Sequence, residues 1–178
     1  MNEYGFKTIT AENWLEVDPI HHHLIVFNED LTKRPQETVV RLKMTLEPTL
    51  NATVPLEVRR LYEVARGTMV YSNLFYPLYA LGAEQLSRVA EAAITERYMT
   101  AGGTNHQLVF NDKIVWLKKQ GVLSAEAAQR WQGIKKGRNR VSHPAQPALF
   151  PAGQATAILQ GITNEINALF DDEVERDQ

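Results

Sequence analysis

The stretch that decides the fold is LGAEQLSRVAEAAITERYM, which covers residues 81–99. Its apolar side chains recur every three or four positions, at Leu81, Leu86, Val89, Ala90, Ala93, Ile94 and Tyr98. An α-helix turns once every 3.6 residues, so this spacing gathers them on one side of a helix. We therefore predict a long amphipathic helix here.

Similar periodicity on both sides of this stretch predicts further helices. They are expected from Pro35 to about Leu46, from Pro55 to about Met69, in a short segment before Gln120-Gly121, from Ser124 into residues 138–143, and from Ala155 to Phe170. Gly102-Gly103 should end the first helix described, with Thr104 capping the next. Residues 11–17 suit one or two helical turns, and residues 24–27 form a short apolar run that suits a strand or a buried turn.

Because short loops join successive helices, neighbouring helices should run antiparallel. The predicted fold is therefore all-α, an antiparallel helical bundle. Residues 54–178 form the bundle, and residues 1–53 are a short N-terminal extension packed against it.

The bulk composition is that of an ordinary globular chain. Its 178 residues suffice for one core, and 44% hydrophobic and 22% charged residues are near the average. No apolar run is long enough for a membrane span, the first residues do not resemble a signal peptide, and the absence of cysteine excludes disulfides and thiolate sites. We expect a cytoplasmic protein with no membrane association.

The charges are segregated along the chain, although the net charge is only −2. Eight basic residues lie between Asp112 and Arg140, against two acidic ones. The last residues are mainly acidic: Asp171, Asp172, Glu173, Glu175 and Asp177 against Arg176. This segregation suits a basic site beside an acidic tail, but on charge alone two solvated helix faces are the favoured explanation.

The segment Arg138-Asn139-Arg140-Val141-Ser142-His143-Pro144 carries the strongest chemical signal. His143 titrates near neutral pH and suits proton transfer, while the guanidinium of Arg138 suits a charged phosphate. Asn139 and His143 are four residues apart and share one helix face. Arg138 and His143 are about 140° apart on an ideal helix, and Pro144 loosens that restriction by moving His143 away from α geometry.

The layout from Lys113 to Pro144 resembles the HEPN superfamily, small helical bundles found in toxins, anti-phage proteins and CRISPR-associated nucleases. Arg138, Asn139 and His143 match its signature in the form Arg-Asn-x-x-x-His. The resemblance covers roughly residues 55–170 in helix order, and its recognisable motif lies within residues 113–144. A bacterial branch with the same layout often has glycine at the position of Arg138, so this arginine favours the active class.

The resemblance implies a metal-independent endoribonuclease of toxin or anti-phage defence systems, acting as a homodimer in which each protomer contributes an arginine and a histidine. Arg138, Asn139 and His143 would be catalytic, with no metal and no cofactor. Lys135, Lys136 and Arg140 would bind RNA, and a protein regulator is a further partner. The alternative is a non-catalytic helical module that binds a protein partner or RNA, in which the motif only holds the helix end.

Three other groups have open roles. Glu84, Arg88 and Glu91 follow the spacing of an ion-pair ladder that stabilises a helix, or that faces inwards and orients the motif. The side chains of His21, His22 and His23 should point in different directions, which favours surface or incidental histidines over a metal site. Core or dimer packing is favoured over base stacking for the aromatic cluster of Tyr71, Phe75, Tyr76 and Tyr79.

Overall fold

The computed structural model describes residues 6–23, 34–141 and 150–171, with the backbone alone described for residues 22–23, 34–38, 41 and 135–141. The described residues form helices joined by turns and loops, without a strand. These helices are α1 (Ile20–His23), α2 (Arg34–Leu46), α3 (Leu56–Tyr71), α4 (Leu78–Thr100), α5 (Phe110–Lys119), α6 (Ala125–Val141) and α7 (Ala152–Asp171). The all-α prediction is confirmed, and none of these helices is long and apolar enough to cross a membrane.

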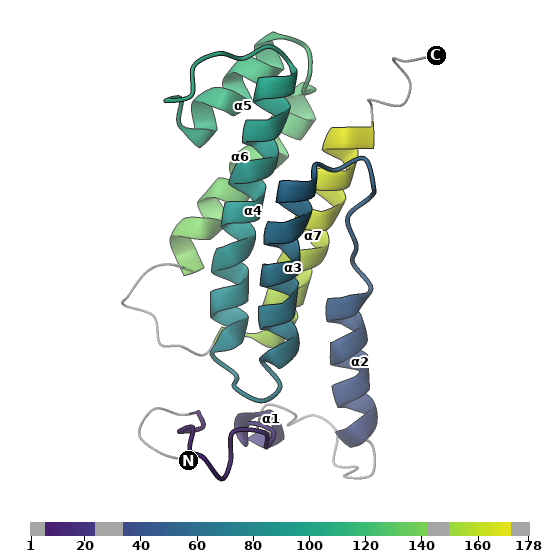
Figure 1. Ribbon diagram of the computed structural model, residues 1–178, viewed down its shortest axis with the longest axis vertical. Coiled ribbons are helices and arrows are strands. Elements are labelled where there is room, and N and C mark those ends of the chain that lie inside the picture. Colours follow the sequence, from purple (N-terminus) through teal and green to yellow (C-terminus); the bar gives the residue numbers. More distant parts are fainter. Residues whose placement is uncertain (1–5, 24–33, 142–149, 172–178) are drawn as a thin grey trace.

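Helices α3, α4 and α7 form the centre of an elongated bundle (Figure 1). α4 contacts α3, α5, α6 and α7, so it is the helix around which the others pack. α2 packs against α3 and α7, while α1 lies across the end of the bundle beside the turn that joins α3 to α4. α6 runs antiparallel to α4, and its C-terminal end lies beside the N-terminal half of α4.

The core follows the predicted helical periodicity. In α4 the buried residues include Leu86, Val89, Ala90, Ala93, Ile94 and Tyr98, whereas Leu81 is 53% exposed. Leu81 precedes Leu86 by five residues, a rotation of about 140° that puts it on the outer face. Gly82 allows α3 and α4 to approach closely, because a Cβ there would lie 2.5 Å from Cγ of Met69.

Two local predictions were wrong. Gly102 has a φ of 95° and ends α4 as expected, but α5 begins at Phe110 and Thr104 does not cap it. The intervening loop folds back on Tyr98, whose hydroxyl accepts the amide of Asn105 at 3.1 Å.

Residues 11–15 form hydrogen-bonded turns instead of a helix. The side chain of Asn13 accepts the amide of Thr10 at 2.9 Å and donates to the carbonyl of Thr8, which closes a compact loop. The short helix α1 that follows was not predicted. The apolar run at residues 24–27 lies outside the described residues.

Candidate functional site

The position of α6 is determined by a tight turn before the helix and by a cap at its first turn. Gly121, with a φ of 73°, follows the end of α5, and the amide of Val122 bonds back to the carbonyl of Leu117 at 2.9 Å. The hydroxyl of Ser124 then accepts the amide of Ala127 at 3.1 Å, so the predicted cap is confirmed. A backbone hydrogen bond at Glu126 and the hydroxyl of Ser124 hold the pKa of Glu126 below its ordinary value. The sequence thus fixes where this helix starts.

The first half of α6 is anchored in the core, and its register carries into the motif. Trp131 is 1% exposed and Ala128 is also buried. Arg138 follows Trp131 by seven residues, so the two positions lie within about 20° of each other around the helix. Position 138 therefore continues the face that packs into the bundle, whereas position 140 lies on the opposite side.

Of the predicted site, the structure places the backbones of Arg138 and Asn139 together in the last turns of α6, along with those of Lys135, Lys136 and Arg140. Their side chains and the whole of His143 lie outside what the structure describes. The relation between Arg138 and His143, on which the expected chemistry depends, therefore stays a prediction.

Among the described residues, Arg88 on α4 does not pair with its two predicted partners, Glu84 and Glu91. Glu84 and Glu91 are half-buried and Arg88 is exposed. Within the described part of the chain, the side chain of Arg88 forms no ion pair with either glutamate. The expected ladder is therefore not formed.

A chain of hydrogen bonds shows which way this face of α4 is turned. Lys113 on α5 is only 6% exposed, and its ammonium donates to the hydroxyl of Thr95 at 2.8 Å. That hydroxyl donates to the carbonyl of Glu91 at 2.8 Å. Thr95 lies within about 40° of Glu84 and Glu91 around α4. The two glutamates therefore belong to the side of α4 that faces α5 and α6, which pack against each other and form the α5–α6 layer.

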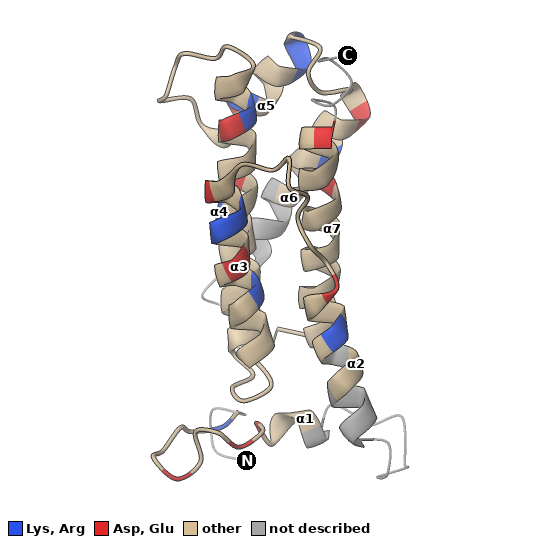
Figure 2. Ribbon diagram, turned by 45° about the vertical axis from the view of Figure 1, so that its right-hand side comes forward, with Lys and Arg blue, Asp and Glu red and all other residues tan. Residues whose placement is uncertain are grey.

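The basic segment does not make one positive surface over its described part. Lys113 is buried against α4, Lys118 and Lys119 are exposed, and Arg130 bonds to Glu165 on α7 at 2.5 Å. Figure 2 shows charges of both signs interspersed along the described helices.

The structure also contains a buried polar cluster that sequence reasoning missed. The carboxylate of Asp18 is fully buried and accepts the amides of Lys7 at 3.3 Å, Ile20 at 3.2 Å and Tyr76 at 2.9 Å. The hydroxyl of Tyr76 in turn accepts the amide of Ala152 at 3.2 Å, where α7 begins. This cluster joins the N-terminal segment, the α3–α4 turn and α7. Asp18-Pro19 is a helix-start signal that indicates α1, but it gives no sign of the contact between Asp18 and Tyr76.

The surface interpretation of the histidines was wrong for His21. Its side chain is 3% exposed, because Asp18 pins α1 beneath the α3–α4 turn. Its Nε2 lies 3.2 Å from the carbonyl oxygen of Ser72. The side chains of His22 and His23 lie outside the described residues, among which no three His, Asp or Glu side chains could together hold a metal ion.

The aromatic cluster divides between core and surface. Tyr76 and Tyr79 are buried and pack edge to face, with ring centroids 5.4 Å apart. Phe75 is half-buried against Phe6, and Tyr71 is 62% exposed. Core packing is therefore confirmed for Tyr76 and Tyr79.

Comparison of the chain with protein-family models, curated proteins and solved structures finds no match. Its function is therefore inferred from the residues and their placement.

Proposed function

We propose that the chain is a HEPN-like, metal-independent endoribonuclease that acts as a homodimer. In this proposal His143 transfers protons, Arg138 holds the charge of the phosphate and Asn139 orients the motif. Toxin or anti-phage defence is the role that the resemblance implies.

One observation carries the proposal. α6 is a single helix from its capped start to Val141, so the position of Arg138 is fixed relative to the buried Trp131. A guanidinium that must meet a developing charge works best when its helix is anchored, because no reorganisation is then needed during the reaction. The half-buried carboxylates of Glu84 and Glu91 lie on the side of α4 that faces the α5–α6 layer. They supply acidic groups that could orient basic ones.

The chemistry follows from these residue types. The 2′-hydroxyl of a ribose attacks the adjacent phosphorus, and the bond from phosphorus to the 5′-oxygen of the next nucleotide breaks. A histidine removes the proton from the attacking hydroxyl, or returns one to the leaving oxygen. An arginine stabilises the additional negative charge on the phosphorane oxygens. Two copies of the motif would supply both proton-transfer roles at one shared site.

A non-catalytic binding module is the second candidate, and the same register favours it. Arg138 continues the face that buries Trp131, and the α4 side that faces this layer carries two half-buried glutamates. An arginine that pairs with carboxylates in such a position is structural, because removing one partner of a buried ion pair is strongly destabilising. The two candidates predict opposite results for the same variants.

The test is RNA cleavage by the full chain in EDTA, with His143→Ala and Arg138→Ala measured beside the wild type. If the motif is catalytic, the wild type cleaves without a divalent ion, and His143→Ala lowers the rate by about 10²–10⁴-fold with little change in melting temperature. Arg138→Ala lowers the rate and also weakens RNA binding, because the lost guanidinium contacts phosphate before and during the reaction.

Arg140→Ala is the matched control, since it removes the same charge from the opposite side of α6. Because Arg140 is itself expected to bind RNA, this variant should weaken RNA binding but keep the maximal rate. Under the binding-module alternative the wild type does not cleave RNA, and removing Arg138 or His143 costs about 1–3 kcal/mol by leaving buried partners unsatisfied. Cleavage only with added divalent ions, or a strict monomer by sedimentation at micromolar concentration, would contradict the nuclease proposal.

A further inference from the structure

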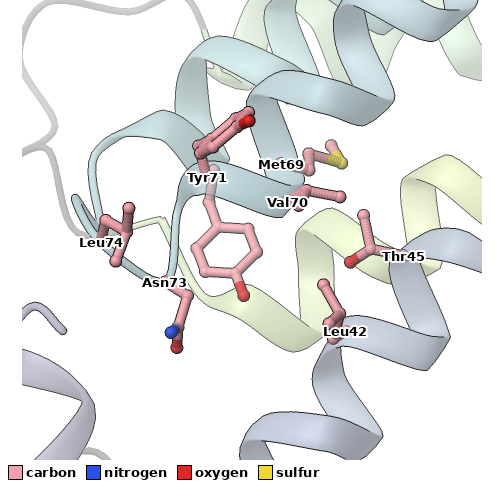
Figure 3. A pocket seen from close by; sticks show the side chains of 8 residues that line it. Leu42, Thr45, Met69, Val70, Tyr71, Asn73 and Leu74 are labelled. Atoms are coloured by element: carbon pink, nitrogen blue, oxygen red, sulfur yellow. The ribbon is translucent and has the colours of Figure 1, made fainter. Parts of the chain in front are cut away.

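A pocket of about 240 Å³ lies between α2, the end of α3 and the turn that leads into α4. It is lined by Leu42, Thr45, Met69, Val70, Tyr71, Asn73, Leu74 and Tyr79. Figure 3 shows Leu42 and Thr45 on one side and Met69 and Val70 on the other, with Leu74 and Asn73 on the turn. None of these lining residues carries a charge, so the pocket suits a neutral occupant.

Tyr79 supplies a polar group to this apolar wall. Only 3% of the residue is exposed, and its ring is held edge-on against Tyr76 and His21 at centroid distances of 5.4 and 6.4 Å. Among the described residues its hydroxyl has no hydrogen-bond partner, and the hydroxyl oxygen is not fully buried, so it is accessible to an occupant of the pocket. An occupant that bonds to this hydroxyl replaces water there and gains a modest contribution from the contact.

The other polar groups are held in place around the same space. The buried Thr45 approaches from α2. The backbone carbonyl of Asn73 accepts the amide of Asp18 at 3.0 Å, which fixes the turn, and the side chain of Asn73 is half-exposed. An apolar cavity with a few fixed polar groups is the usual form of a small-molecule site.

We propose that this pocket binds a small neutral molecule that has one aromatic ring or a short alkyl chain and one hydroxyl or carbonyl group. The apolar part packs against Leu42, Met69 and Leu74, and the polar group bonds to the hydroxyl of Tyr79. The size agrees, because a cavity of about 150 Å³ already accommodates benzene. The site is independent of the motif on α6, and its occupancy does not require nuclease activity.

The test uses p-cresol, toluene and benzoate as probes, titrated into the full chain by calorimetry or ligand-observed NMR. p-Cresol should bind about two- to tenfold more tightly than toluene, which matches its ring but lacks the hydroxyl. Benzoate should not bind, because its charge would be buried without a partner. Tyr79→Phe keeps the ring and should reduce the affinity for p-cresol to that for toluene.

Leu42→Trp adds bulk at the partly exposed rim and should abolish binding of both p-cresol and toluene. Leu81→Trp adds the same side chain at an exposed position on the outer face of α4 and should leave binding unchanged. Melting curves check that each variant is folded, and Tyr79→Phe tests the pocket even if Leu42→Trp does not fold. The proposal is overturned if wild-type protein binds no p-cresol at millimolar concentration, which would mean a pocket that holds only water. Equal affinity of the wild type and Tyr79→Phe for p-cresol would overturn it as well.

Discussion

α6 and α7 both pack against α4, with 17 and 20 residues respectively, yet they are built differently. α7 has buried residues on one face along its whole length: Ala155, Thr156, Leu159, Ile162, Thr163, Ile166, Leu169 and Phe170. α6 buries Ala128 and Trp131 in its first half, and after Ile134 its sequence continues Lys-Lys-Gly-Arg-Asn-Arg. The sequence of the last turns of α6 therefore offers few apolar side chains of the kind that hold α7, and the motif lies in this polar stretch.

The largest expected effect comes from removing the buried side chains that anchor α6 and α7. Trp131→Ala in α6 should lower the free energy of unfolding by about 3–5 kcal/mol, and Ile166→Ala in α7 by about 2–5 kcal/mol, because both side chains are fully buried. Urea denaturation measures both changes. Val115→Ala, at a 51% exposed position on α5, is the control and should stay within about 0.5 kcal/mol of the wild type. A loss below 1 kcal/mol for Trp131→Ala would mean that α6 is not fixed by its first half.

The same contrast shows what the sequence could predict. A helix such as α4 or α7 has apolar residues at regular spacing over many turns, so its existence and its buried face follow from periodicity alone. The cap at Ser124 was predictable for a similar reason, since the interaction is local. These features placed most of the helices and the register that leads to Arg138.

The polar cluster around Asp18 could not be predicted in this way. Asp18 accepts the amide of Tyr76, which lies 58 residues away in the sequence, and no local pattern records that pairing. Likewise, the spacing of Glu84, Arg88 and Glu91 suggested an ion-pair ladder, although within the described residues Arg88 pairs with neither glutamate. Spacing identifies residues that can meet, whereas tertiary packing decides whether they do.

A smaller effect should come from the polar contact within the apolar layer of α7. Tyr62 on α3 is 1% exposed, and its hydroxyl lies 2.7 Å from the Thr163 hydroxyl on α7 and 2.8 Å from the carbonyl oxygen of Pro48. Tyr62→Phe should cost about 0.5–1.5 kcal/mol in denaturation at neutral pH. The exposed Tyr71→Phe should cost almost nothing. Equal stabilities for the two variants would mean that α7 is held by apolar contacts alone.

Tyr62 also predicts how stability depends on alkaline pH. Burial raises the pKa of Tyr62 above its ordinary value of 10.0, and this outweighs the opposite effect of the hydrogen bond with Thr163. The folded state therefore retains the phenol proton more strongly than the unfolded state does. This contribution is fully present below a pH of about 10 and is lost as the pH rises through the folded-state pKa. Denaturation between neutral pH and pH 11 should show a shallower decline for Tyr62→Phe than for the wild type.

The smallest expected effect comes from replacing one glycine on the outer face of α6 and one on the outer face of α7. Gly133 in α6 and Gly161 in α7 both lie within helices, and apart from the helix's own backbone a Cβ added at either would meet no atom of the described residues within 4 Å. Gly133→Ala and Gly161→Ala should each stabilise the protein by about 0.5–1 kcal/mol, because alanine has less conformational freedom to lose on folding. Gly82→Ala is the opposite control and should destabilise, since its Cβ would meet Met69.

Gly133→Ala and Gly161→Ala should also differ in their effect on association if α6 takes part in a dimer. The open space around the two glycines is that of a single copy of the chain. A methyl group at position 133 that weakens association, while the same change at 161 does not, would identify the outer face of α6 as part of the interface between protomers. Sedimentation of both variants over a concentration series measures this difference. If both gain stability and keep the wild-type oligomeric state, the outer face of α6 near Gly133 is free, and any shared site would have to be built from the last turns of the helix.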